Sequence, residues 1–266
     1  MSGDGETWVR PTTDEWDDVV SEEIDLAARD GVVPALLYRP AHPTAARLPG
    51  VVIGAEAYGV NDFSRRVAAT LAHLGAVVVV PDYYRGDGLA DPEAYHDFTE
   101  VIARIERLDF TLATLDLVAG VDHLEARGDV DASRVAVWGY CTGGTLAWLA
   151  ACLCRELAAA VLFFPSQPVF AELGPTRPVH PVNLLWAIAC PTLFIYGEED
   201  AVVSPELADD LQRRIEGWQV TAEVRRYPGA GHAFSAPVAP LRHEEADRAA
   251  WQDALDFAHR HLRFSR

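Results

Sequence analysis

A cysteine lies between two glycines in the segment 139–143, Gly-Tyr-Cys-Thr-Gly, directly after the apolar run 135–137. The spacing glycine-x-nucleophile-x-glycine is typical of a sharp turn from a strand into a helix, which exposes the central side chain. Glycines at both positions let neighbouring chain approach closely. At a helix N-terminus the dipole favours a thiolate, and the N–H of Thr142 points to where an oxyanion would form. The pattern predicts Cys141 as a nucleophile, with a packed structural thiol as the alternative.

A base and an orienting acid are expected at later strand ends, in the order nucleophile, acid, histidine. Asp200 follows the predicted strand 192–196 and His232 follows the predicted strand 222–227, in this order. We expect His232 to take the thiol proton and Asp200 to fix the histidine tautomer. Glu198 and Glu199 compete with Asp200 for the acid role. Taken singly, Asp200 could be a helix cap or turn residue, and His232 a surface loop histidine.

Short β-branched runs alternate with amphipathic helical patterns along the chain. Strands are predicted at 50–54, 76–80, 134–138, 159–164, 192–196 and 222–227, and helices at 62–74, 142–155, 205–216 and 242–262, with two more within 91–126. The turn Asp30-Gly31 predicts a leading hairpin. This α/β pattern predicts a mostly parallel sheet of about eight strands, covered by helices on both faces, with the antiparallel hairpin at one edge. We expect a flexible segment over 1–20, then a single domain over 21–266 without a separate lid domain.

Composition limits the partners that the protein can have. The formal net charge of −18 disfavours nucleic acid and anionic membranes. The longest apolar runs are too short to span a bilayer, and the acidic N-terminus does not resemble a signal peptide. We therefore expect a cytoplasmic monomer or homodimer with its four cysteines reduced and a small molecule as its partner. The sequence implies no metal and no organic cofactor.

Four segments together resemble the dienelactone hydrolase family, cysteine-dependent members of the α/β-hydrolase fold. The matching segments are 139–144, 197–200, 229–234 and the early segment 51–61. The resemblance extends from about residue 24 to the C-terminus and implies that fold and the triad described above. In relatives a glutamate that matches Glu56 contacts the resting thiol and is displaced by substrate, so that the thiolate forms only then; without the resemblance, Glu56 would be a solvated loop carboxylate. The N–H of Ala57 matches the second oxyanion donor.

The chain departs from this family at positions that bear on the substrate. Relatives that act on dienelactone hold its carboxylate with two arginines, and Ala236 stands where one of them is expected. The other matches the helical region before the elbow, where Arg104 or Arg107 could serve, although either could be a solvated helix arginine. The connection 165–181 is expected to form one wall of a more apolar pocket. The residues expected to line that pocket are Tyr58, Tyr84, Tyr140 and Arg104.

These features predict a cysteine hydrolase of the dienelactone hydrolase (carboxymethylenebutenolidase) type, which opens an ester or a lactone through a thioester intermediate. Cys141 attacks, the N–H groups of Ala57 and Thr142 hold the oxyanion, and water then attacks with His232 as base. Two alternatives keep the same fold. One is a ligand-binding or sensor protein with little turnover, and the other is an enzyme that cleaves a C–C bond or closes a ring.

Overall fold

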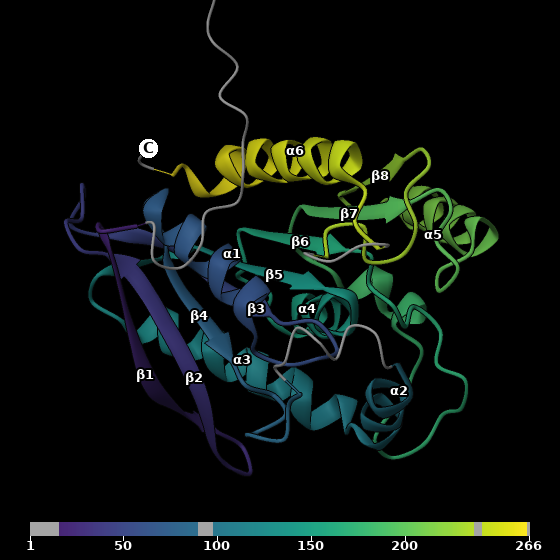
Figure 1. Cartoon of the computed structure of the whole chain (residues 1–266), viewed down its shortest axis with the longest axis horizontal. Coiled ribbons are helices and arrows are strands. Elements are labelled where there is room, and N and C mark those ends of the chain that lie inside the picture. The colour runs from purple at the N-terminus through teal and green to yellow at the C-terminus, as the bar shows by residue number, and fades with distance from the viewer. Residues whose placement is uncertain (1–15, 90–97, 237–240, 265–266) are drawn as a thin grey trace, which may run out of the picture.

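The computed structural model describes residues 16–89, 98–236 and 241–264, and all of its named strands belong to one sheet (Figure 1). The strands are β1 (Val19–Ala28), β2 (Gly31–Pro40), β3 (Leu48–Gly54), β4 (Val77–Pro81), β5 (Val130–Tyr140), β6 (Ala159–Phe163), β7 (Thr192–Gly197) and β8 (Ala222–Tyr227). The helices are α1 (Asp62–His73), α2 (Phe98–Arg107), α3 (Phe110–Ala126), α4 (Cys141–Leu153), the 3-10 helix η3 (Pro181–Ala187), α5 (Pro205–Trp218) and α6 (Glu244–Leu262).

The predicted mostly parallel sheet with an antiparallel N-terminal hairpin is confirmed. The eight strands follow the order β1-β2-β4-β3-β5-β6-β7-β8. Strands β3 to β8 run parallel to one another, whereas β2 pairs antiparallel with both β1 and β4. The two residues of the hairpin turn are Arg29 and Asp30, one position before the predicted Asp30-Gly31, because Ala28 pairs with Gly31. Gly31 begins β2 with a φ of 140°, which only glycine adopts readily. Strand β5 begins at Val130, four residues before the predicted start at 134.

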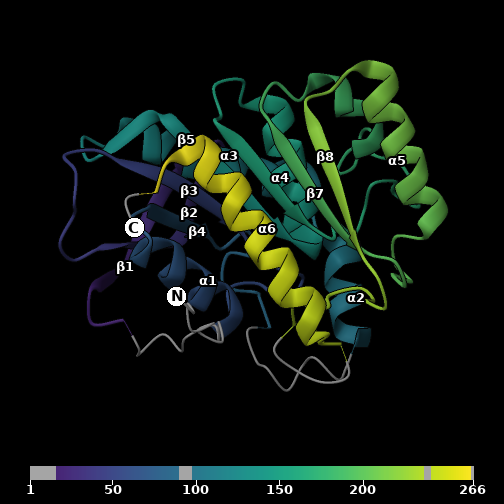
Figure 2. The same cartoon turned by 90° about the horizontal axis from the view of Figure 1, so that it is seen from above.

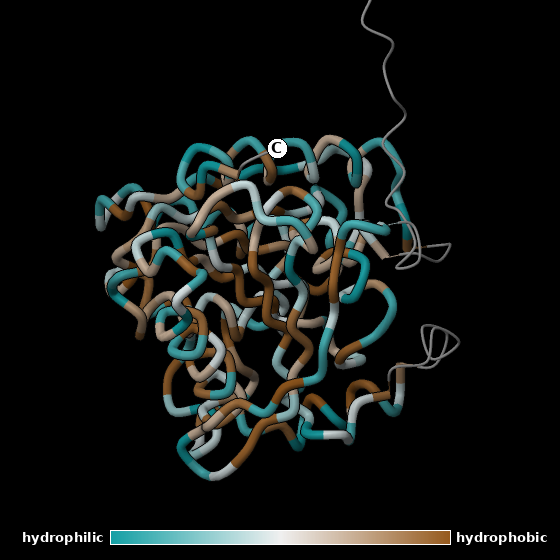
Figure 3. The backbone as a smooth tube through the Cα atoms, turned by 90° about the vertical axis from the view of Figure 1, so that its left-hand side faces the viewer, coloured by the Kyte–Doolittle hydropathy of each residue, from teal (hydrophilic) through white to brown (hydrophobic). Residues whose placement is uncertain are grey.

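Helices cover both faces of the sheet. Helices α1 and α6 pack on one face, and α3 and α4 pack on the other (Figures 1 and 2). Aromatic rings pack in both interfaces. The ring centroids of Trp138 in β5 and Trp251 in α6 are 5.4 Å apart, and those of Trp148 in α4 and Phe194 in β7 are 5.0 Å apart. Figure 3 shows the hydrophobic strands at the centre of the molecule and hydrophilic segments around them. Strands buried on both faces are apolar throughout rather than alternating.

The helical pattern predicted within 91–126 divides at Asp109. The side chain of Asp109 accepts a hydrogen bond of 3.0 Å from the N–H of Leu112, which caps the start of α3. The helix η3 follows the connection 165–181 and was not indicated by the sequence pattern.

The N-terminal segment expected to be flexible falls mostly outside the described residues. Residues 1–15 are not described, and β1 already begins at Val19. None of the helices in the described part of the chain is both long and apolar enough to cross a membrane.

Three glycines let β3, β5 and α4 meet backbone to backbone. A Cβ atom at Gly54 or at Gly139 would lie 2.4 Å or 2.3 Å from the carbonyl oxygen of Gly143. A Cβ atom at Gly143 would lie 2.0 Å from the carbonyl oxygen of Ala55. Each distance is far below van der Waals contact, so any larger residue would push these segments apart. This contact sets the first turn of α4 against the end of β3.

The substitution Gly143→Ala is therefore expected to lower the free energy of unfolding by about 3 kcal/mol or more, or to prevent folding. Urea denaturation followed by circular dichroism measures this change. Gly217→Ala in α5 is the matched control, because its Cβ meets open space and alanine is favoured in a helix by about 1 kcal/mol. A Gly143→Ala protein as stable as the wild type would contradict the close packing.

Candidate active site

Cys141 is the first residue of α4 and directly follows the end of β5 at Tyr140. Its φ of 52° lies in the left-handed region, which costs a non-glycine residue about 1–2 kcal/mol. This backbone conformation turns the chain from strand into helix without an intervening loop. The N–H groups in the first turn of a helix have no acceptor within the helix, and that of Thr142 is one of them.

The side chains of Cys141, His232 and Asp200 form a continuous series of contacts. The sulfur of Cys141 lies 3.2 Å from Nε2 of His232, and Nδ1 of His232 lies 2.9 Å from Oδ2 of Asp200. Oδ1 of Asp200 accepts hydrogen bonds from the N–H groups of Val202 and Val203, both at 2.8 Å. A carboxylate held in this way accepts the Nδ1 proton and leaves Nε2 facing the sulfur.

The loops at the carboxyl ends of β7 and β8 bring Asp200 and His232 together. A Cβ atom at Gly197 would lie 2.1 Å from the carbonyl oxygen of Ala230, so the two loops touch backbone to backbone. The two glutamates that precede Asp200 are exposed, whereas Asp200 is 2% exposed. Of the three acids in this segment, Asp200 is the one that contacts the imidazole.

Electrostatics favour a thiolate paired with an imidazolium. Burial acts to raise the pKa of Cys141, but the charge and hydrogen bond of His232 outweigh it and hold the pKa below its ordinary value. Burial also acts to lower the pKa of His232, but the charges and hydrogen bonds of Cys141 and Asp200 outweigh it and raise the pKa to about 10. Both directions favour the charged form of the pair.

Glu56 follows the end of β3 and shares the lining of one cavity with Cys141. Its Oε1 accepts a hydrogen bond of 2.8 Å from Nδ2 of Asn61, and the residue is 4% exposed. The negative charge of Glu56 acts to raise the pKa of Cys141 and so opposes the effect of His232. Glu56 is therefore the charged group that opposes ionisation of the thiol, whereas His232 favours it.

Tyr83 anchors the segment that carries Glu56 and Ala57. Its hydroxyl donates to the carbonyl oxygens of Ala55 at 3.0 Å and Glu56 at 2.7 Å. The ring is buried, and burial raises the pKa of Tyr83 well above its ordinary value, so the hydroxyl remains a donor. Sequence reasoning missed Tyr83, because the contact joins residues 27 and 28 positions apart and no motif marks it.

Ser166 is a second site residue that sequence reasoning missed. Its N–H donates to the carbonyl oxygen of Cys141 at 3.2 Å, and its hydroxyl acts to lower the pKa of the thiol. It follows Phe164, which has a φ of 37° and whose ring lies 5.4 Å from the imidazole of His232. Ser166 lies just beyond the end of β6, the neighbour of β5. The strand-end rule that singled out Asp200 and His232 would also have singled out this position.

A cavity of about 370 Å³ includes Cys141 and His232 in its lining. Glu56, Ala57 and Ser166 also line it, and most of the remaining wall consists of apolar side chains from α2 and from the loops after β7 and β8. Its volume falls within the range that accommodates small organic ligands.

One of the four residues predicted to line the pocket does so. Tyr58 lines the cavity, whereas Tyr84, Tyr140 and Arg104 are not among its lining residues. Tyr140 is 1% exposed and packs among aromatic rings, including that of Phe163 at 4.6 Å. Residues that flank a nucleophile in sequence alternate across the sheet, so the side chain of Tyr140 enters the core while the sulfur faces the cavity.

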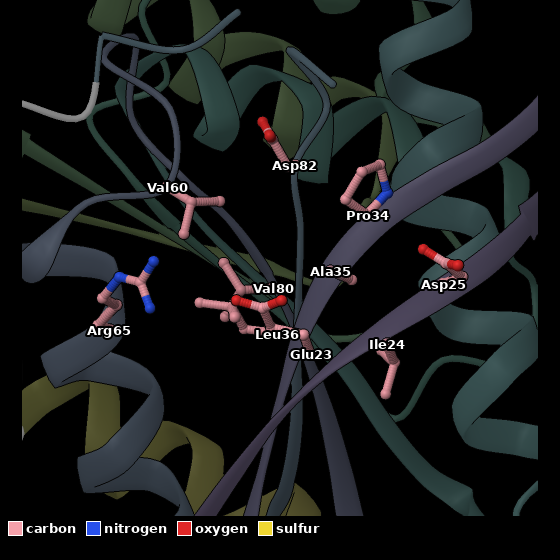
Figure 4. A pocket seen from close by; sticks show the side chains of 10 residues that line it. All are labelled: Glu23, Ile24, Asp25, Pro34, Ala35, Leu36, Val60, Arg65, Val80 and Asp82. Atoms are coloured by element: carbon pink, nitrogen blue, oxygen red, sulfur yellow. The ribbon is translucent and has the colours of Figure 1, made fainter. Parts of the chain in front are cut away.

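A second hollow of about 450 Å³ lies between the β1–β2 hairpin and the start of α1 (Figure 4). Its polar lining residues are Glu23, Asp25, Asp82 and Arg65. Neither cysteine, serine nor histidine is present among its ten lining residues. In the described ranges, no three histidine, cysteine or acidic side chains gather to hold a metal ion. The cavity at Cys141, in contrast to this hollow, has a cysteine, a histidine and a serine in its lining.

Comparison with known proteins identifies relatives that cover most of the chain. The Salmonella typhimurium protein named "Putative carboxymethylenebutenolidase" is 29% identical over 85% of this chain and 82% of its own. The "Carboxymethylenebutenolidase" of Rhodococcus opacus is 32% identical over 80% of this chain and 81% of its own.

A solved structure and a family match complete the comparison. The crystal structure of a "Putative Dienelactone Hydrolase" from Klebsiella pneumoniae superposes with a TM-score of 0.81, at 28% identity, and covers 90% of this chain and 98% of that one. Residues 33–262 match the dienelactone hydrolase family. The chain therefore belongs to the dienelactone hydrolase family.

Proposed function

We propose that the protein hydrolyses an ester or a lactone with Cys141 as the nucleophile. The observation that carries this proposal is the series of contacts from the Cys141 sulfur through His232 to Asp200, at 3.2 Å and 2.9 Å. The names of its relatives, carboxymethylenebutenolidase among them, support a reaction of this type. No metal or organic cofactor enters the proposed reaction.

In the first half of the reaction the thiolate attacks the acyl carbon. The carbonyl oxygen becomes an oxyanion, which the N–H groups of Thr142 and Ala57 stabilise. The C–O bond to the leaving group then breaks, and His232 gives its Nε2 proton to the leaving oxygen. The product of this half is a thioester on Cys141, with the alcohol released from an ester or still attached in a lactone.

In the second half water attacks the thioester. His232 takes a proton from the water through Nε2, and Asp200 stabilises the imidazolium that forms. The C–S bond breaks and the thiolate is regenerated. The carboxylic acid gives up its remaining proton to solvent and leaves as a carboxylate. The two half-reactions therefore use the same oxyanion donors and the same base.

Glu56 regulates the thiol in this proposal. Its carboxylate disfavours the thiolate, and the family resemblance implies that substrate displaces it. An exposed thiolate is readily oxidised, so opposition by Glu56 in the resting site protects the nucleophile. A single domain over residues 21–266, a cytoplasmic location and a monomeric or homodimeric state stay predictions.

Replacement of the triad residues tests the proposal. We expect Cys141→Ala to abolish turnover of activated esters and the acyl adduct seen by mass spectrometry. His232→Ala is expected to slow acyl transfer by about 1,000-fold or more, as in other triad deletions. Cys190→Ala is the matched control, because its thiol is buried away from the cavity lining. Turnover by Cys141→Ala at the wild-type rate would exclude this nucleophile.

The pH dependence of thiol alkylation tests the ion pair. Because the pKa of Cys141 is lowered, iodoacetamide should modify it near neutral pH, and the rate should fall only as the pH drops through that lowered pKa. In His232→Ala the effect of burial on the thiol remains, but the charge and hydrogen bond of His232 that opposed it are lost. The pH profile of alkylation should therefore move above the ordinary thiol pKa of 9.0.

The other three thiols are an internal control for that experiment. Burial raises the pKa of Cys152 and Cys154 to about 12 and that of Cys190 to about 11. Peptide mapping after alkylation near neutral pH should therefore find the label on Cys141. Equal labelling of Cys154, which is partly exposed, would show that Cys141 has no special reactivity.

Tyr83→Phe tests the anchoring of the oxyanion donor. Loss of the hydroxyl frees the carbonyl oxygens of Ala55 and Glu56, so the N–H of Ala57 loses its fixed position. We expect kcat to fall about tenfold or more with a smaller change in KM, because the donor acts in the transition state. Tyr227→Phe is the control, since that hydroxyl bonds Asp253 outside the cavity. An unchanged kcat in Tyr83→Phe would contradict this role.

A further inference from the structure

One face of α2 forms the apolar wall of the catalytic cavity. The lining residues from this helix include Phe98, Val101, Ile102 and Ile105, which are spaced i, i+3, i+4 and i+7. This spacing places all four side chains on one side of a helix. An apolar helix face normally packs against the core, but here Phe98 is 47% exposed and Ile102 is 53% exposed. The face is therefore directed at the space that a substrate would fill.

The described lining of the cavity contains no arginine. The two internal segments outside the described residues, 90–97 and 237–240, contain neither arginine nor lysine in their sequences. Ala236, at the position where dienelactone-binding relatives carry an arginine, is 2% exposed and packs with Ala57, Tyr58 and Val101. The described lining therefore offers no arginine or lysine side chain to pair with a substrate carboxylate.

Arg104 on α2 is not among the cavity-lining residues and is bound by other side chains. Its guanidinium pairs with Oδ2 of Asp87 at 2.7 Å and with Oε1 of Glu100 at 3.3 Å, and it also donates to the carbonyl oxygen of Asp87. These partners satisfy the arginine on the side of α2 that joins the loop after β4. Arg104 therefore fixes α2 to that loop.

A second arginine close to α2 is also occupied. Arg177, in the connection after β6, donates to the carbonyl oxygens of Ile105 and Glu106 near the end of the helix. Its guanidinium lies over the rings of Phe110 and Phe170, at 5.1 Å and 5.8 Å from their centroids. Cations at a helix C-terminus satisfy its last carbonyl groups and stabilise it. Arg177 holds the apolar face in place and has no part in the lining of the cavity.

The charged side chains that do line the cavity, apart from the catalytic pair, are acidic. Glu56 and Glu106 both belong to the lining. A substrate carboxylate placed among apolar side chains and two acids would lose its hydration without gaining a partner, which is strongly unfavourable. A neutral alkyl or aryl group in the same place would gain by burying apolar surface.

We propose that this site selects uncharged, apolar esters or lactones and rejects substrates that carry a carboxylate on the acyl part. The inference rests on the proposed function and specifies its substrate class. Val202, 52% exposed at the cavity, extends the apolar surface beyond α2 and would be covered by a longer acyl chain. The departure from the carboxylate-binding pattern therefore changes the specificity while the catalytic triad is kept.

Three substrates of equal acyl length test the proposal on the full-length protein. They are p-nitrophenyl hexanoate, the methyl p-nitrophenyl diester of adipic acid and the mono-p-nitrophenyl ester with a free carboxylate. We expect kcat/KM for the carboxylate to be about 100-fold or more below that for its methyl ester. From butanoate to hexanoate, kcat/KM should rise about threefold to fourfold for each added methylene. Values for the carboxylate and its methyl ester within about threefold of each other would overturn the inference.

A charge introduced at the cavity supplies the matched comparison. Ile102→Arg should raise kcat/KM for the carboxylate relative to its methyl ester by about tenfold or more, whereas Ile102→Gln, which removes the same apolar side chain, should not. Val32→Arg adds the same charge on the distant hairpin and should leave the ratio unchanged. Measurements in high salt separate the cavity from the net charge of −18, since exposed charges are screened. Loss of the preference in high salt would overturn the assignment to the cavity.

Ligand binding can also be measured without turnover, because a molecule bound in the cavity protects Cys141 from iodoacetamide. Octanamide should slow alkylation of Cys141, and octanoate at the same concentration should not. Equal protection by both compounds would overturn the selectivity. Failure of the proposed function has a different signature: ester hydrolysis that survives in Cys141→Ala, whatever the charge of the substrate.

Discussion

The active site depends on a backbone contact in which Gly54 of β3, Gly139 of β5 and Gly143 of α4 approach more closely than any side chain would permit. The contact places the first turn of α4 directly beside the end of β3. Cys141 and the N–H of Thr142 lie on one side of it, and Glu56 and Ala57 lie on the other. Chain packing thus positions the proposed nucleophile and the proposed oxyanion donors, before any side-chain interaction is considered. The left-handed conformation of Cys141 is a local cost of this arrangement.

Burial strengthens the interactions among the charged groups of the site. The protein tolerates these buried charges because they are paired with one another and with backbone N–H groups. Asp200 is almost completely buried, yet one oxygen faces His232 and the other accepts two backbone N–H groups. The imidazolium lies between this carboxylate and the thiolate. Removal of the imidazolium would leave two negative charges without a cationic partner in an apolar setting. Glu56, which accepts a hydrogen bond from Asn61, acts in the opposite direction to His232, since its charge disfavours the thiolate and makes the resting site less reactive than the pair alone would be.

Much of this arrangement follows from the sequence, because the relevant signals are local. Alternating apolar runs and helical patterns predict the sheet and its strands, and the positions directly after the strands predict where Cys141, Asp200 and His232 come together. The contacts of Tyr83 and Ser166 depend on neighbouring strands that are distant in sequence, so no spacing reveals them. The orientation of Tyr140 and Arg104 depends on which face of an element is turned to the cavity. A family pattern of substrate-binding residues does not specify that face, and the structure places both side chains elsewhere.

The acidic and apolar lining has a further consequence for the direction of the catalytic cycle. In the proposed reaction, hydrolysis would turn an uncharged substrate into a carboxylate within the same cavity. In proximity to Glu56 and Glu106, with the nearby arginines engaged by other partners, the newly formed anion is repelled into solvent. The features proposed to exclude an anionic substrate would therefore also speed product release. Accumulated acid would compete poorly with fresh ester, so product inhibition would be weak.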